Sequence, residues 1–240
     1  SGVPLALVPS GTGNLLARNL HLTLNDLAQS IAVAFTGADR SIDIAVAELH
    51  REDGSADEHA YLVMAGIGLD ANMAANTNGT LKKRIGWLAY ADPIAKSVRG
   101  NKQLPMRFGL DGAPSTEMRA HTVIVGNCGT LTANLLLLPD AVIDDGKLDV
   151  VVLTPKGAGG WMRIGSRLLA GGILHRTKGG RLIMRNTPGI RALQYVQAGE
   201  VELEFETPEQ VELDGDSFGT ILNATIRVEH GGLTVRVPAV

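Results

Sequence analysis

The sequence predicts an α+β protein: a mostly antiparallel β-sandwich with a few helices, preceded by the remnant of an α/β layer. Three observations lead to this prediction. From about residue 38, apolar and polar residues alternate in many short runs, which is the period of a half-buried strand. Short turns rich in Gly and Asp separate these runs, as in β-hairpins. Before residue 38, one apolar run is followed by a glycine-rich turn and by residues at helical spacing.

The start of the chain combines a short strand, a flexible turn and a helix. Residues 3–8 (VPLALV) are apolar and bounded by Pro9, which is typical of a buried strand. The turn SGTGN at 10–14 leads into LLARNL at 15–20, whose apolar residues have helical spacing. Turn N–H groups and a helix start both favour an anion such as phosphate. An ordinary strand-to-helix turn uses glycine in the same way, so these residues alone leave both interpretations open.

A second helix is predicted over residues 23–35. Thr23 is a suitable N-cap, with Asp26 three positions later. Gly37 is a suitable end of the helix. Three apolar residues share one face of this helix: Leu27, Ile31 and Phe35.

The remaining elements are mostly strands. Residues 40–49 alternate cleanly, 51–58 form a charged turn, and 59–66 form the second strand of a hairpin. Helices are predicted at 79–99, interrupted at Pro93, and at 161–173. Strands are predicted at 104–110 and 116–125 around the turn Asp111-Gly112, at 148–153, and over most of the chain from Arg181 onward.

Two patterns near the C-terminus are informative. Residues 200–206 (EVELEFE) alternate acid with apolar, which predicts one packed and one solvated face. A row of glutamates also suits a metal ion, but a solvated face is the interpretation we adopt. Residues 224–228 and 233–237 flank His-Gly-Gly at 230–232, which predicts a closing hairpin.

The composition is that of a globular protein in a reducing environment. Hydrophobic residues make up 45% and charged residues 20% of the 240 residues. The net charge of -3 and the aromatic content of 4% argue against a nucleic-acid partner. The single cysteine, Cys128, excludes an internal disulfide, and we expect it to be a small buried residue rather than a nucleophile. No apolar run reaches the roughly 18 residues of a membrane span. We therefore expect a cytoplasmic protein.

Three further stretches place carboxylates at turns. GIGLDA at 66–71 ends a strand, VIDDGKLD at 142–149 leads into one, and LDGD at 213–216 places two acids around a glycine. Each stretch alone is typical of an ordinary turn, because Asp-Gly is a frequent hairpin signal.

Taken together with the opening loop, these stretches resemble the bacterial diacylglycerol kinases and their sphingosine- and ceramide-kinase relatives. The order and spacing of the family's segments fit essentially the whole chain. The matching segments are 9–18, 66–71, loosely 82–90, Asn127, 139–149 and 214–216. The family's upstream GGDGT loop does not occur. The resemblance therefore implies that 1–37 are the end of an α/β nucleotide-binding domain. Residues 38–240 would be the β-sandwich lipid-kinase C-terminal domain, with last strands expected to return to the first domain.

The resemblance also implies ATP-dependent transfer of a phosphoryl group to a lipid hydroxyl, such as that of diacylglycerol. Asp216 stands where the family usually has a glutamate general base, so its reach is one methylene shorter; Asp214 is the second candidate base. Mg²⁺ would be held by Asp145 and the carbonyls of Val142 and Lys147. Asp70 would support the cleft. The nucleotide would lie on Gly11, Thr12, Gly13 and Asn14.

The sequence leaves other interpretations open. Basic residues at 82–84 beside apolar and aromatic ones at 85–90 suit docking on anionic lipid, but also suit a helix with a charged end. For the lipid kinase we expect transient, peripheral contact with the inner face of the membrane. The sequence does not decide whether the protein forms a homodimer. Two alternative functions are a soluble-substrate kinase related to NAD kinases and a non-catalytic lipid-binding or regulatory β-sandwich module.

Overall fold

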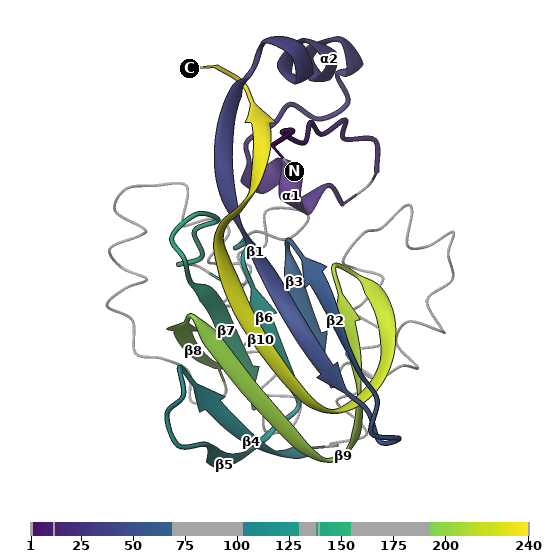
Figure 1. The fold of residues 1–240 in the computed structure, drawn as a ribbon, viewed down its shortest axis with the longest axis vertical. Coiled ribbons are helices and arrows are strands. Elements are labelled where there is room, and N and C mark those ends of the chain that lie inside the picture. The colour runs from purple at the N-terminus through teal and green to yellow at the C-terminus, as the bar shows by residue number, and fades with distance from the viewer. Residues whose placement is uncertain are drawn as a thin grey trace.

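The computed structural model describes residues 2–11, 13–68, 103–129, 138, 140–154 and 193–239. Within these ranges, ten strands form one antiparallel sheet with the order β2-β1-β10-β9-β3-β6-β7-β8, and β4 joins β9 to β5 (Figure 1). The predicted helices at 79–99 and 161–173, together with Thr12 and Asp70, lie outside the described residues. The strands are β1 (Ala38–His50), β2 (Ala56–Tyr61), β3 (Met64–Ile67), β4 (Leu104–Leu110), β5 (Thr116–Ala120), β6 (Thr122–Gly126), β7 (Leu148–Leu153), β8 (Leu193–Ala198), β9 (Glu200–Leu213) and β10 (Asp216–Val237).

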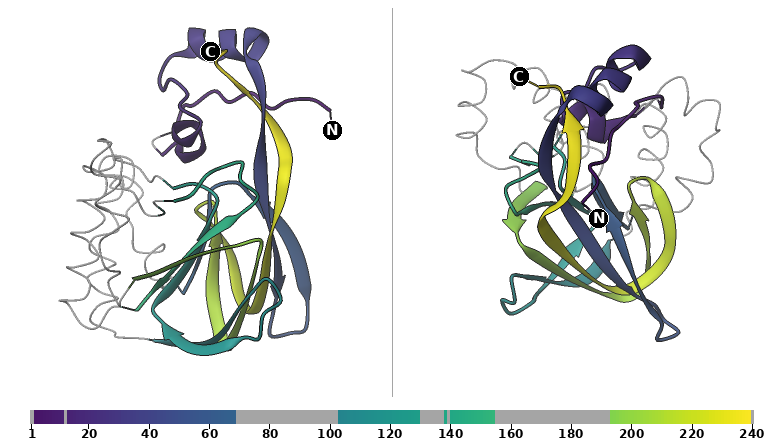
Figure 2. Two further views of the ribbon diagram at one scale, coloured as in Figure 1. Left: turned by 90° about the vertical axis from the view of Figure 1, so that its left-hand side faces the viewer. Right: turned by 45° about the horizontal axis from the view of Figure 1, so that its top comes forward.

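The sheet bends so that one of its faces encloses the main core (Figure 2). Buried side chains from distant strands meet in one cluster, among them Leu49 of β1, Val150 of β7 and Leu203 of β9. The alternation at 200–206 has the predicted consequence: Val201, Leu203 and Phe205 are buried, whereas the glutamates between them keep contact with solvent. The predicted β-sandwich is therefore confirmed.

The N-terminal segment lies at one end of this sandwich, together with α1 (Leu15–Asn19) and α2 (Leu27–Thr36) (Figure 1). The start of β1 and the end of β10 extend to it as a paired ribbon. The predicted strand at 3–8 is reduced to a single parallel bridge between Leu5 and Val235. A second, smaller core joins this end to the sandwich and contains Leu20, Ile42, Val63, Cys128, Ile143 and Val235.

Helix α2 begins later than predicted. Asp26, rather than Thr23, is the N-cap, and its carboxylate accepts a 2.9 Å hydrogen bond from the N–H of Gln29. Gly37 is the C-cap, as predicted. Asp26 satisfies an N–H that would otherwise lack a partner, which is the usual reason for an acidic cap.

The predicted closing hairpin at 230–232 is wrong. Strand β10 continues through these residues and pairs with β1 on both sides, with Ile44 opposite Glu229 and Ile42 opposite Leu233. The three residues form a bulge opposite Asp43, and Gly231 has a φ of 63° there. The reason is a long-range one, since the carboxylate of Asp43 binds the bulge from the neighbouring strand.

Candidate functional site

The glycine-rich loop is held in shape by its own residues. Asn14 adopts a left-handed conformation with φ 48° and forms two hydrogen bonds with the main chain of Gly11, one as donor and one as acceptor. The Nε of Arg18 donates a 2.8 Å hydrogen bond to the carbonyl of Gly13. Helix α1 follows directly but has only 5 residues. Because α1 is short and the N–H of Gly11 is already bonded, an anion at this segment would depend on the remaining N–H groups of the loop.

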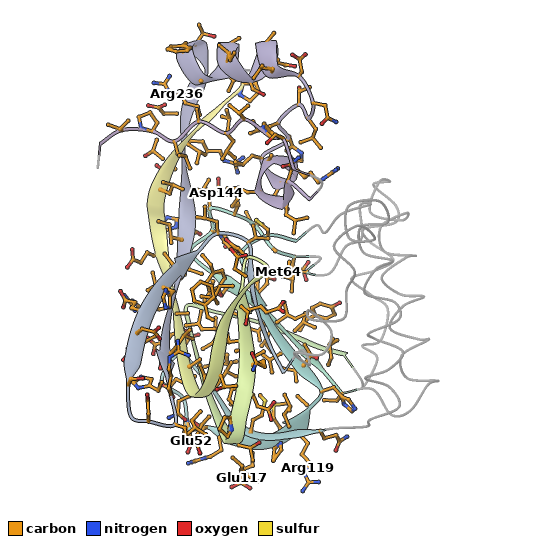
Figure 3. All side chains as sticks on the ribbon, turned by 90° about the vertical axis from the view of Figure 1, so that its right-hand side faces the viewer. Glu52, Met64, Glu117, Arg119, Asp144 and Arg236 are labelled. Carbon is orange, nitrogen blue, oxygen red and sulfur yellow. The ribbon has the colours of Figure 1, made fainter. Side chains whose placement is uncertain are left out.

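The acidic turn before β7 is anchored at two points. The guanidinium of Arg40 pairs with the carboxylate of Asp144, at 2.9 Å from Nε and 2.6 Å from Nη2. The N–H of Gly146 donates a 2.7 Å hydrogen bond to Oδ2 of Asp43. Within the turn, Asp145 Oδ1 accepts a 3.1 Å bond from the N–H of Lys147. Figure 3 shows Asp144 at the end of the sandwich that faces α1.

Negative charge is concentrated around this turn. Asp149 is 4% exposed. The pKa of Asp149 is raised to about 6, mainly because the carboxyl group is buried. The hydrogen bond from Gln197 lowers this pKa, whereas the negative charges of Asp145 and Asp140 raise it. A cation at the turn would relieve this repulsion. Among the residues that the structure describes, no group of three or more His, Cys, Asp or Glu side chains is arranged to hold a metal ion. The predicted magnesium ligands are a single carboxylate, Asp145, with two main-chain carbonyls, which is a set that hard cations accept.

Asp43 is a buried carboxylate that the sequence did not single out. Its side chain is 0% exposed, whereas that of His230 is 68% exposed. Oδ1 accepts bonds of 2.8 Å from His230 Nδ1 and from the N–H of Gly231. Oδ2 accepts the bond from Gly146. One carboxylate thus joins β1, the bulge of β10 and the acidic turn.

The two acids of the LDGD turn differ in their surroundings. Both are exposed at the tip of the β9–β10 hairpin. The carboxylate of Asp214 accepts three hydrogen bonds, from the N–H groups of Leu62 (2.9 Å), Val63 (2.8 Å) and Met64 (3.0 Å). These bonds divide the predicted strand at 59–66 into β2 and β3. In the described part of the chain, no hydrogen bond or ion pair involves the carboxylate of Asp216. The two acids therefore differ: the carboxylate of Asp214 is hydrogen-bonded to the main chain, whereas that of Asp216 is available to a substrate.

Asn127 connects the two carboxylate clusters. Its side-chain NH₂ donates a 3.0 Å bond to the carbonyl of Asp43, and its own N–H donates a 3.0 Å bond to the carbonyl of Val63. Val63 in turn donates to Asp214. A continuous series of hydrogen bonds therefore runs from the acidic turn through Asp43, Asn127 and Val63 to the LDGD turn.

Comparison with known proteins identifies the family of this chain. The sequence pattern of the YegS C-terminal NAD kinase beta sandwich-like domain matches residues 62–237. The chain belongs to this family. A Pseudomonas aeruginosa protein named "Probable lipid kinase YegS-like" is 29% identical over 241 residues, which cover 98% of this chain and 68% of the relative. A Mycobacterium tuberculosis protein named diacylglycerol kinase is 25% identical over 150 residues, covering 62% of this chain and 47% of the relative.

A solved structure agrees on the fold. The crystal structure of a diacylglycerol kinase from Bacillus anthracis superimposes with a TM-score of 0.67 at 22% sequence identity, covering 98% of this chain and 69% of that one. This YegS-family chain therefore spans about two thirds of the structure and of the Pseudomonas relative. Neither of the two described helices combines the length and the hydropathy needed to cross a bilayer.

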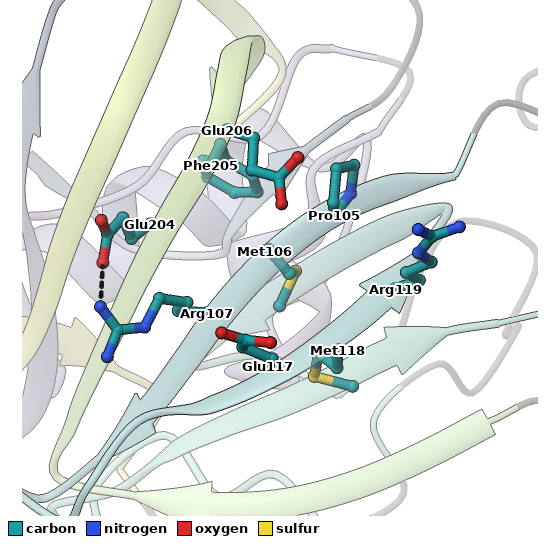
Figure 4. Close-up of a pocket in the computed structure, with 9 residues that line it drawn as sticks. All are labelled: Pro105, Met106, Arg107, Glu117, Met118, Arg119, Glu204, Phe205 and Glu206. Atoms are coloured by element: carbon teal, nitrogen blue, oxygen red, sulfur yellow. Dashed lines mark hydrogen bonds and ion pairs between the residues drawn. The ribbon is translucent and has the colours of Figure 1, made fainter.

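A groove of the YegS-family chain lies away from these clusters. It has a volume of about 320 Å³ and opens on β4, β5 and β9 (Figure 4). Arg107 and Glu204 form a 3.4 Å ion pair across it. No site residue predicted from the sequence lines it. Figure 3 shows two of its residues, Glu117 and Arg119, at the end of the sandwich remote from α1. Its charged cross-strand rows are those of a solvated sheet face.

Cys128 is a buried residue of the smaller core. The residue as a whole is 1% exposed. Burial, and secondarily the negative charge of Asp214, raises the pKa of Cys128 to about 12 from an ordinary value near 9. Folding therefore favours the neutral thiol. Its contribution to stability is fully present below pH 9 and is lost as the pH rises toward 12, at up to about 1.4 kcal/mol per pH unit.

We expect a thiol reagent at pH 8 to react with Cys128 only after urea unfolds the protein. Between pH 8 and pH 10 the wild type should lose more stability in urea titrations than Cys128→Ala, in which the thiol is absent. Rapid reaction in native buffer, or equal losses for both proteins, would contradict the assignment.

Proposed function

We propose that this chain is part of an ATP-dependent lipid kinase that transfers the γ-phosphoryl group to a lipid hydroxyl, such as that of diacylglycerol. The observation that carries the proposal is the available carboxylate of Asp216, in a segment that matches the family's general-base position. The family membership over residues 62–237 supports it. The names of the Pseudomonas and mycobacterial relatives support the lipid as acceptor.

In the proposed reaction Asp216 accepts the proton of the lipid hydroxyl as that oxygen attacks the γ-phosphorus. A base must reach within about 3 Å of the hydroxyl, directly or through one water. The glycine loop contributes N–H groups and the hydroxyl of Thr12 to the phosphates of ATP. Asp70 supports the cleft from the segment after β3. Phosphoryl transfer requires mainly that the reacting groups are aligned and that the charge of the phosphates is neutralised. In this proposal the glycine loop, Asp70 and Asp216 align the reacting groups.

The proposal includes Mg²⁺ at the acidic turn, held by Asp145 and the carbonyls of Val142 and Lys147. When bound, the ion would neutralise the local carboxylates and stiffen the turn. We expect about 10 mM Mg²⁺ to stabilise the wild type by about 1–3 kcal/mol, through binding to the folded state alone. Asp145→Asn should abolish this effect in thermal melts. Asp53→Asn, in the β1–β2 turn, is the matched control and should retain it. Identical melting curves of the wild type with and without Mg²⁺ would remove the assignment.

Residues 1–37 are proposed to be the end of a nucleotide-binding domain whose other part packs against α2. The face of α2 that carries Leu27, Ile31 and Phe35 has no cover in the described structure, and these side chains are 62%, 47% and 83% exposed. Such a continuous apolar face usually marks an interface. A longer protein with a GGDGT loop would bury it and complete the site for ATP.

The test compares the 240-residue chain with the longer protein in an assay of labelled ATP and diacylglycerol vesicles. We expect the longer protein to label the lipid and the chain alone to be inactive. Labelling of a soluble nucleotide in place of the lipid would favour the kinase of soluble substrates. Lipid binding without turnover by the longer protein would favour the non-catalytic module. Turnover by the chain alone would contradict the proposed incomplete site.

A further inference from the structure

The carboxylate of Asp214 is fastened to the main chain of the segment at 62–64. Both of its oxygens are occupied: Oδ2 accepts from Leu62, and Oδ1 accepts from Val63 and Met64. Hydrogen bonds between backbone N–H groups and a carboxylate are roughly twice as strong as neutral ones. Protonation would remove the charge that strengthens these bonds, so a general base at this position would weaken its own anchoring during each turnover.

The main chain of the turn is fixed as well. Leu213 pairs with Asp216, so the turn has two residues, and Asp214 and Gly215 have φ values of 51° and 92°. This is the tight hairpin turn that matches the twist of the strands, and glycine adopts its second position without strain. The N–H of Asp214 donates a 2.9 Å bond to the carbonyl of Met64. Side chain and backbone therefore fasten the turn to the same segment.

This fastening joins two of the motifs. Met64 begins β3, which ends at Ile67 and leads into the segment with Asp70. Asp216 is the first residue of β10, two positions after Asp214. Because Asp216 has no side-chain bond of its own in the described structure, its direction depends on the turn that precedes it.

We propose that Asp214 is a positioning residue that holds the carboxylate of Asp216 toward the substrate cleft, by binding the N–H groups of Leu62, Val63 and Met64. The proposal rests on the proposed function, because it takes Asp216 as the base. It assigns to Asp214 a task in catalysis that requires no proton transfer by Asp214 itself. A displacement of about 1 Å at a catalytic group can lower the rate by about 10²-fold.

The chain provides a matched control for this proposal. Asp111 is also the first residue of an Asp-Gly turn, with φ 50° followed by Gly112 at φ 71°. Its Oδ1 accepts backbone bonds from Gly199 (2.8 Å) and Glu200 (2.9 Å). It joins the β4–β5 turn to the connection between β8 and β9. Asp111→Asn therefore makes the same substitution in an equivalent turn, without any contact to the proposed site.

The experiment uses the proposed longer protein that includes a GGDGT loop, with the variants Asp214→Asn and Asp111→Asn. Asparagine at position 214 keeps one acceptor oxygen, but its NH₂ group faces the remaining backbone N–H groups, and two donors cannot form a hydrogen bond. We expect Asp214→Asn to lower kcat per folded molecule by about 10- to 100-fold with a nearly unchanged KM for ATP. The carboxyl ¹³C resonance of Asp216 should shift or broaden, and amide exchange should accelerate at Leu62, Val63 and Met64. Asp111→Asn should change neither kcat nor this resonance.

Two results would overturn the proposal. An unchanged kcat and an unchanged Asp216 resonance in Asp214→Asn would show a purely structural acid. Rescue of Asp214→Gly by added formate, as for a missing carboxylate base, would make Asp214 the base. If the wild type lacks lipid kinase activity, the proposed function fails; the Asp216 resonance then still decides whether Asp214 orients its neighbour.

Discussion

Replacing Asp216 with asparagine is expected to lower kcat of the proposed longer kinase by about 10³-fold, with little change in the KM for ATP. Asparagine has nearly the same shape but cannot accept the proton of the lipid hydroxyl, and a positioned general base typically contributes 10²- to 10⁴-fold. A steady-state assay with labelled ATP and diacylglycerol vesicles measures both constants.

Stability provides an internal control for this result. No hydrogen bond or ion pair in the described structure involves the carboxylate of Asp216, so Asp216→Asn should leave the melting temperature within the range of a neutral surface change. A loss of activity with an unchanged melting curve then reports on chemistry rather than folding.

The matched variant is Asp216→Glu, which restores the residue usual in the family. We expect it to retain at least the wild-type kcat, since the longer side chain extends the reach of the carboxylate. If Asp216→Asn keeps kcat within about tenfold of the wild type, the base is another group.

The regular part of the fold was predictable because its signals are local. The alternation at 200–206 determines which side chains of β9 enter the core, and the structure buries Val201, Leu203 and Phe205 accordingly. The turn Asp111-Gly112 connects β4 and β5 as its residues predict, because both residues tolerate a positive φ. Each of these features depends on neighbours within a few positions of the chain.

The errors arose where a distant residue decides the local structure. His-Gly-Gly at 230–232 has the composition of a hairpin turn, yet it forms a bulge because it lies opposite Asp43. His230 and Asp43 are separated by 187 residues, so no local pattern identifies this pair. The one available signal was Asp43 itself, a charge between Ile42 and Ile44 in an otherwise apolar part of the strand.

The motifs located the carboxylates of the candidate site but could not assign their partners. Asp214 and Asp216 are two positions apart and look equivalent in the sequence. They differ because Asp214 meets the N–H groups of a segment about 150 residues away, as between Asp214 and Met64. Sequence spacing cannot show which acid is bonded, since the bonding depends on how β9 and β3 pair.

Asp43→Ala is expected to lower the free energy of unfolding by about 3–5 kcal/mol, the largest stability change among the variants considered. Removing the carboxylate leaves the half-buried N–H groups of Gly146 and Gly231 without acceptors and His230 without its partner. A cavity remains where the side chain is 0% exposed. Urea unfolding of the wild type and the variant gives the difference directly.

Asp39→Ala is the matched control, since it removes a carboxylate from the same strand. Asp39 forms a surface ion pair with Arg236, at 2.8 Å and with the Asp39 side chain 53% exposed. Exposed pairs contribute about 0–1 kcal/mol, so the control should be nearly neutral. Should Asp43→Ala fail to fold, Asp43→Asn serves in its place, because its amide oxygen still accepts a hydrogen bond and we expect about half the loss. A loss within 1 kcal/mol for both Asp43 variants would contradict the role of Asp43, because the bulge of β10 and the acidic turn would then hold together without it.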